Sequence, residues 1–164
     1  MEENIYGYDR ETLECLAGFE SLWQRVTERT APVSFSEDET LLHLIRQEIC
    51  AARGYTALTR MFQNHSRTLL AAHGADARRR ARRLQAEYFI RTGLRCDSSA
   101  DCGHPGEKLA SLRHLFQREQ ELSAAYEKAA MQTRCPVLKE LYTRFSAETG
   151  DRSKALRALL LDCF

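Results

Sequence analysis

The sequence has few of the residues that interrupt helices. Its 164 residues include 8 glycines and 3 prolines, and β-branched residues do not form runs. Glycine and proline disfavour helices most strongly, whereas β-branched side chains favour strands. Hydrophobic residues make up 43% of the chain and charged residues 29%, a mixture that allows one domain with a sizeable core. The composition therefore predicts an all-α protein.

Three further absences limit the classes of function. The formal net charge is only +1, so no overall field directs the chain toward nucleic acid or an anionic membrane. No run of about 18 apolar residues exists, as a membrane-spanning helix would need. The first residues, MEENIYGYDRE, are acidic and lack an apolar stretch, so we expect no signal peptide. These features predict a cytoplasmic protein with no membrane partner.

The six cysteines lie at positions 15, 50, 96, 102, 135 and 163. Cysteines of cytoplasmic proteins are mostly thiols. Four of these, at 15, 50, 135 and 163, fall within helical patterns and are interpreted as small apolar side chains. Cys96 and Cys102 lie in a loop, and the sequence leaves open whether they form a disulfide or stay free. Their spacing is not that of a CxxC pair, which argues against a zinc site.

Hydrophobic periodicity predicts five helices, over about 9–28, 36–63, 66–92, 108–134 and 136–161. Ser36 and Glu39 have the spacing of a capping box, Gly93 is a typical helix stop, and Pro136 marks a helix start. The connection 94–107 is the one long loop, so it should cross a bundle whose other neighbours are antiparallel. We therefore expect an N-terminal helix and linker over 1–35 and a four-helix bundle over 36–164.

The N-terminal helix carries its own apolar stripe: Leu16, Phe19, Trp23 and Val26. The four-helix core already supplies a complete seam, so this stripe must cover an outer face of the bundle or pair with a second chain. A homodimer is the expected oligomer, and a further protein partner is left unidentified.

The apolar seams of the four bundle helices are interrupted by charged residues in a repeating pattern. Each of the second and fourth helices has a central glutamate, Glu48 or Glu119, followed seven residues later by a tyrosine. Each of the third and fifth has an arginine, Arg80 or Arg152, three residues after a small residue. Glutamate and arginine are 32 residues apart in the first half and 33 in the second. This repeat indicates that the bundle arose by duplication of a helix pair.

This pattern resembles the ferritin-like superfamily, and its rubrerythrin-like branch most closely, over residues 36–164. The matching segments are EICAARGY from Glu48, EYFIRTG from Glu87 and EQELSAAY from Glu119. The family pattern Asp-Glu-x-x-His-x-x-x-Leu falls on DARRRARRL and ETGDRSKAL. The resemblance implies a four-helix bundle with a long crossover loop. It also implies a di-iron site held by two lone glutamates and two Glu-x-x-His motifs.

The motif positions depart from the family in both halves. The two motif glutamates are replaced by Ala77 and Thr149, and the two motif histidines by Arg80 and Arg152. Arginine has no lone pair to offer a metal and adds positive charge where cations would lie. We therefore expect no cofactor, because the di-iron site is degenerate and its redox chemistry is lost with it.

We predict instead that the two arginines fill the vacated space and pair with Glu48 and Glu119, since a guanidinium matches a carboxylate bidentately. The tyrosines of the repeat would donate to the remaining carboxylate lone pairs: Tyr55 and Tyr126. An alternative interpretation is that Arg80 and Arg152 extend along the bundle and reach solvent at its ends.

These features leave three function hypotheses. The first is a rubrerythrin-like or ferritin-like protein without metal or enzymatic activity, acting by structure or partner binding. The second is an oxidoreductase or iron-handling protein with iron or another transition metal at an altered site: Glu48, Glu119, His73 and Glu87. A core histidine bonded to a neighbour is the plainer interpretation of His73. The third and weakest is nucleic-acid binding by the arginine run 78–83, which more simply forms a solvated or partner-facing surface.

Overall fold

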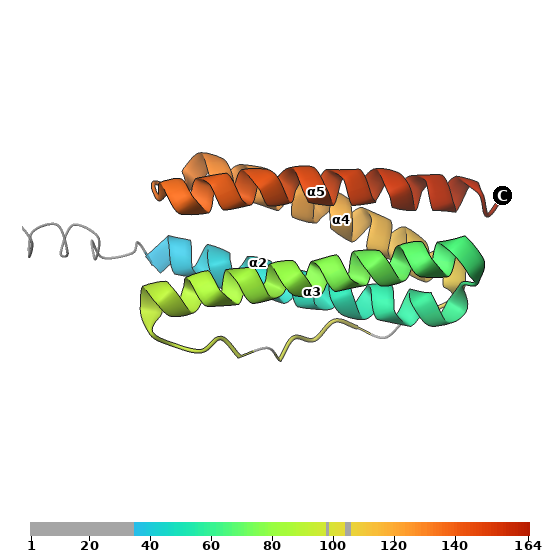
Figure 1. Ribbon diagram of the computed structural model, residues 1–164, viewed down its shortest axis with the longest axis horizontal. Helices are drawn as coiled ribbons and strands as arrows, with labels where there is room; N and C mark the ends of the chain where they lie inside the picture. The colour runs from blue at the N-terminus through green and yellow to red at the C-terminus, as the bar shows by residue number, and fades with distance from the viewer. Residues whose placement is uncertain (1–34, 98, 104–105) are drawn as a thin grey trace, which may run out of the picture. The chain divides into compact units, whose positions relative to one another are not determined.

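The computed structural model describes residues 35–97, 99–103 and 106–164. These residues form four helices and no strand (Figure 1): α2 (Phe35–Met61), α3 (Asn64–Thr92), α4 (Lys108–Gln132) and α5 (Pro136–Leu161). The predicted all-α, four-helix bundle is confirmed for this part of the chain. The helix expected over 9–28 and the segment 1–35 lie outside it, except for Phe35.

The helix ends follow local chemistry. Gly93 adopts φ 70°, the left-handed conformation that favours glycine, and its N–H donates to the Phe89 carbonyl at 2.8 Å, which ends α3. Pro136 opens α5, where a missing N–H costs nothing. Helix α2 begins one residue before Ser36, so Ser36 lies inside the first turn rather than at the N-cap position we expected.

Two tight helical hairpins make up the bundle. Helices α2 and α3 are joined through two residues, α4 and α5 through three, and the two hairpins meet mainly along α2 and α4. Figure 1 shows the loop after α3 running the length of the α2–α3 hairpin before α4 begins, so α2 and α4 run in opposite directions. The predicted long connection is therefore present, and the two hairpins that it joins pack along α2 and α4.

The interior has two apolar clusters with a polar layer between them. One cluster contains Leu41, Ile45 and Leu84, with residues from α4 after position 121 and from α5 before position 146. The other contains Leu58 and Leu70, with residues from the opposite halves of α4 and α5. On each helix the break between clusters falls at the charged residue of the seam. The polar layer therefore lies at mid-height in the bundle.

The described helices do not include one with both the length and the apolar character needed to cross a bilayer.

Candidate functional site: the buried ion-pair layer

Four charged side chains form the polar layer, one from each helix. Their exposed fractions are 0% for Glu48 and Glu119, 2% for Arg80 and 4% for Arg152. Each occupies a seam position that the helical period turns inward. Glu48, Arg80 and Glu119 have an apolar residue one turn away on both sides, whereas Glu148 and Thr149 lie one turn before Arg152. An isolated charge at such a position strongly destabilises the folded state. The stability of the bundle therefore depends on how these four groups pair.

The first half of the layer forms a closed network. Arg80 Nε donates to Glu48 Oε1 at 2.6 Å and Arg80 Nη2 to Oε2 at 2.8 Å, a bidentate fork. The Tyr126 hydroxyl, from the other half of the bundle, donates to Glu48 Oε1 at 2.7 Å. Arg80 Nη1 lies 3.5 Å from Glu148 Oε2, a partly exposed carboxylate that the sequence analysis did not assign to the layer. Glu48 is thus fully engaged by donors from two helices.

The second half pairs less completely. Arg152 Nη2 donates to Glu119 Oε2 at 2.9 Å and to Thr149 Oγ1 at 3.2 Å. Arg152 Nε and Nη1, Glu119 Oε1 and the Tyr55 hydroxyl are buried without a hydrogen-bond partner of standard geometry. The Arg152 guanidinium lies 5.9 Å from the centre of the Tyr55 ring, which gives it a cation–π contact. The two helical hairpins therefore hydrogen-bond their central glutamates unequally.

The four groups share one electrostatic environment. Burial alone would lower the pKa of Arg80, but the hydrogen bonds and charge of Glu48 outweigh it and raise that pKa above its usual value. Burial, with the negative charge of Glu48, raises the pKa of Glu119 to about 8. The pKa values of Tyr55 and Tyr126 are also raised, first by burial and then by the neighbouring carboxylates. Both tyrosines therefore stay protonated and neutral, and Tyr126 acts as a neutral donor to Glu48.

The residues of the layer do not fit the di-iron centre that the resemblance implies. Ala77 offers no ligand atom, and the Thr149 hydroxyl donates to the Phe145 carbonyl at 2.6 Å. The Arg80 guanidinium holds both oxygens of Glu48 and the Arg152 guanidinium holds one oxygen of Glu119, and each places a positive charge where a metal would lie. Within residues 35–97, 99–103 and 106–164, no three His, Cys, Asp or Glu side chains are grouped so as to hold a metal ion.

The alternative ligand set from the sequence analysis is likewise not brought together. Glu87 pairs with Arg83 one helical turn before it, with Arg83 Nη2 at 2.6 Å from Glu87 Oε1. The His73 ring packs against Tyr55, with ring centres 5.7 Å apart, and burial lowers the pKa of His73. Arg83 thus engages Glu87, whereas His73 Nε2 is buried without a hydrogen-bond partner, and among the described residues neither joins a group of three metal-ligating side chains.

The arginine run separates as the helical period predicts. Arg80 is buried, whereas the other four are exposed: Arg78, Arg79, Arg82 and Arg83. The alternative in which Arg80 and Arg152 reach solvent at the bundle ends is wrong, because both side chains stop at a carboxylate in the middle of the bundle.

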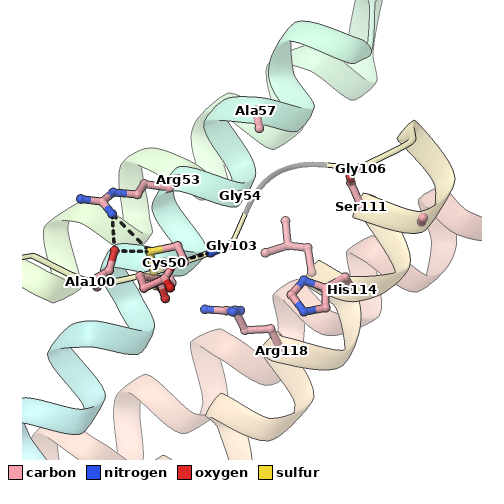
Figure 2. A pocket seen from close by; sticks show the side chains of 14 residues that line it. Cys50, Arg53, Gly54, Ala57, Ala100, Gly103, Gly106, Ser111, His114 and Arg118 are labelled. Carbon is pink, nitrogen blue, oxygen red and sulfur yellow. Dashed lines mark hydrogen bonds between the residues drawn. A yellow bond between two sulfur atoms is a disulfide. The ribbon is translucent and has the colours of Figure 1, made fainter.

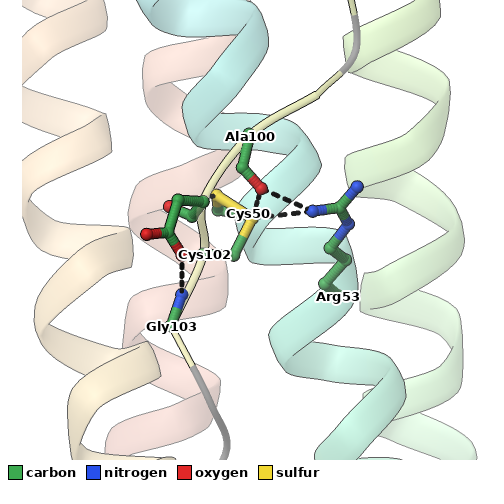
Figure 3. Close-up of a disulfide and its surroundings, with 6 residues drawn as sticks. Cys50, Arg53, Ala100, Cys102 and Gly103 are labelled. Atoms are coloured by element: carbon green, nitrogen blue, oxygen red, sulfur yellow. Dashed lines mark hydrogen bonds between the residues drawn. A yellow bond between two sulfur atoms is a disulfide. The ribbon is translucent and has the colours of Figure 1, made fainter.

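The cysteine expectations need a correction. Cys50, interpreted as an apolar thiol within a helix, forms a disulfide with Cys102, while Cys96 is a free thiol. Figure 3 shows the crossover loop passing Cys50 on α2, so that Cys102 lies against it. Arg53, one turn along α2, donates to the Ala100 carbonyl at 2.6 Å and contacts Cys102 Sγ at 3.4 Å. The path of the loop, which helical periodicity does not encode, determines this pairing.

The disulfide lies at the edge of a pocket of about 620 Å³ between α2, α4 and the crossover loop. Figure 2 shows Arg53 reaching it from α2, and His114 and Arg118 from α4. The crossover loop is thus held against α2 by the Cys50–Cys102 disulfide and by the hydrogen bond from Arg53.

Comparison of the chain with protein-family models, with curated proteins and with solved structures gives no match.

Proposed function

We propose that this protein is a ferritin-like bundle of the rubrerythrin-like branch whose di-iron site has been replaced by two buried, hydrogen-bonded glutamate–arginine pairs. In this proposal it acts without metal or redox chemistry, through its structure or by binding a partner. The observation that carries the proposal is the position of the guanidinium groups of Arg80 and Arg152. Both are hydrogen-bonded to the glutamates that the family pattern would assign to metal.

The arrangement of the helices supports the assignment. Two helical hairpins joined by a long crossover are the connection that the ferritin-like resemblance implies. The four residues at the family's glutamate and histidine positions lie in one layer at mid-height, one from each helix.

The chemistry of the layer supports the loss of metal. A di-iron centre needs several anionic and neutral donors around two cations, whereas this layer contains two permanent cations of its own. The bidentate pair and the hydrogen bond from Tyr126 already engage both oxygens of Glu48. An entering metal would have to displace a buried guanidinium and leave it without a counter-ion.

Metal analysis tests the proposal directly. Protein purified from iron-supplemented cells, and protein titrated with Fe²⁺ without oxygen and then aerated, should contain far less than one iron per chain. Its thermal midpoint should not change with iron. About two irons per chain with an oxo-bridge absorption band would show that the proposal is wrong.

Restoring the family motif gives the complementary test. The variant Ala77→Glu, Arg80→His, Thr149→Glu, Arg152→His introduces four family-type ligands. With Glu48 and Glu119 the layer then contains six. If the layer descends from a di-iron site, this variant should bind iron and gain thermal stability from it. The variant Arg79→His, Arg83→His is the matched control, because its histidines lie outside the bundle. A folded restored variant with no iron binding would count against the ferritin-like assignment.

A further inference from the structure

A second feature of the α2–α3 hairpin lies on its outer face. A groove of about 460 Å³ runs between the two helices and is lined by four arginines: Arg53, Arg60, Arg78 and Arg82. No aspartate or glutamate belongs to its lining. Along α2 the two arginines are seven residues apart, which is about 10 Å, and along α3 they are one turn apart. The groove therefore gathers four positive charges within a short length of the hairpin.

The arginines next to the groove differ from those that line it, because they pair with carboxylates. Arg79 pairs with Asp76 at 2.8 Å and Arg83 with Glu87 at 2.6 Å. Among the ion pairs of the described residues, none joins an arginine of the groove to a carboxylate. Arg78 instead donates to Thr56 Oγ1 at 3.3 Å across the groove. The arginines of the groove thus keep a positive charge without a carboxylate partner among the described residues. Arg53 is already hydrogen-bonded to the Ala100 carbonyl of the loop, so Arg60, Arg78 and Arg82 are the ones left to hold another molecule.

The apolar side chains of the lining are more buried than its exposed arginines. Ile49, Ala52, Ala57 and Ala81 are buried or half-buried and are called the floor, while Thr56 and Gln85 add hydrogen-bonding groups. Its volume lies within the range of about 300–1,000 Å³ of small-molecule sites. Arginine forks suit phosphate oxygens better than a point charge does. An apolar floor under such a rim suits a ligand with a compact flat or apolar part.

We propose that the α2–α3 groove binds a small organic phosphate carrying at least two negative charges next to a flat or apolar group, as a nucleoside diphosphate does. The phosphates lie between Arg60 of α2 and the two arginines of α3, Arg78 and Arg82, and the organic part covers the alanine floor. A long nucleic acid is disfavoured because the surface beyond the groove on α3 is neutralised by the Asp76 and Glu87 pairs. This inference is independent of the ferritin-like assignment.

Calorimetric titration of the full chain with ADP, with adenosine and with inorganic pyrophosphate tests the proposal. ADP should bind more tightly than pyrophosphate, adenosine should bind least, and the affinity for ADP should fall as salt rises. Arg78→Ala, Arg82→Ala should weaken ADP binding by about tenfold or more, since two charge-assisted contacts are lost. Arg79→Ala, Arg83→Ala removes the same charge from the same helix and should change the affinity less than about twofold.

Three results would overturn the proposal. One is the absence of ADP binding at millimolar concentration in low salt. Another is equal weakening by the two double variants, which would indicate a general basic surface rather than a groove. The third is tight binding of a fluorescent single-stranded oligonucleotide that pyrophosphate and ADP fail to displace. Both variants replace exposed side chains, so circular dichroism should show the same fold for each.

Discussion

Replacing Arg80 by methionine tests the central physical claim, that two buried charges are tolerated only as a pair. Methionine keeps most of the length and apolar stem of arginine but removes the fork that holds Glu48. Glu48 would then retain only the hydrogen bond from Tyr126 in a site with no solvent exposure. Breaking one partner out of a buried ion pair costs about 3–5 kcal/mol.

That magnitude is large compared with the whole stability of a domain, about 5–15 kcal/mol. With a urea m-value near 1.5–2 kcal/mol/M, the unfolding midpoint should fall by about 2–3 M while m stays constant. Arg79→Met is the matched control: its side chain is 70% exposed, its partner Asp76 lies one turn away, and the expected change is below about 0.5 kcal/mol.

The double variant Glu48→Gln, Arg80→Met separates pairing from simple loss of contacts. It removes both charges, and the glutamine oxygen can still accept from Tyr126. Each single variant should be destabilised by several kcal/mol, whereas the double variant should return to within about 1–2 kcal/mol of the parent protein. Additive losses in the double variant, or an unchanged midpoint in Arg80→Met, would refute the reasoning.

Two further predictions concern the other half of the layer and the loop. Because the folded-state pKa of Glu119 is raised to about 8, the folded protein binds the proton more tightly than the unfolded chain does, and the free energy of unfolding should fall between about pH 4.5 and pH 8. The free energies of unfolding of the parent protein and of Glu119→Gln, measured by urea unfolding at several pH values, should differ in their pH slope by up to about 1.4 kcal/mol per pH unit. Parallel plots of the two free energies against pH would contradict the prediction. Reducing the Cys50–Cys102 bond, which closes 52 residues, should lower stability by up to about 4 kcal/mol. Thiol titration should then gain two groups, and Cys50→Ser, Cys102→Ser should not respond to reductant; a parent protein equally unresponsive would contradict the pairing.

The sequence alone determined the helical architecture and the level of the charged layer. Scarce glycine and proline, together with apolar residues at spacings of three and four, leave few alternatives to helices of this length. The same period placed Arg80 on the inner face and its arginine neighbours outside, because one residue along a helix turns a side chain by about 100°. Gly93 and Pro136 set helix ends through their own backbone restrictions, which act locally.

Only the tertiary structure decided which atoms meet. Glu48 and Glu119 differ in hydrogen bonding because this depends on how close the facing helices lie to each glutamate. The tyrosine that donates to Glu48 comes from the other half of the chain. The Cys50–Cys102 pairing depends on the path of the crossover loop. Helical periodicity fixes the direction of a side chain from its own axis. It carries no information about the distance between two axes, which packing of the whole bundle sets.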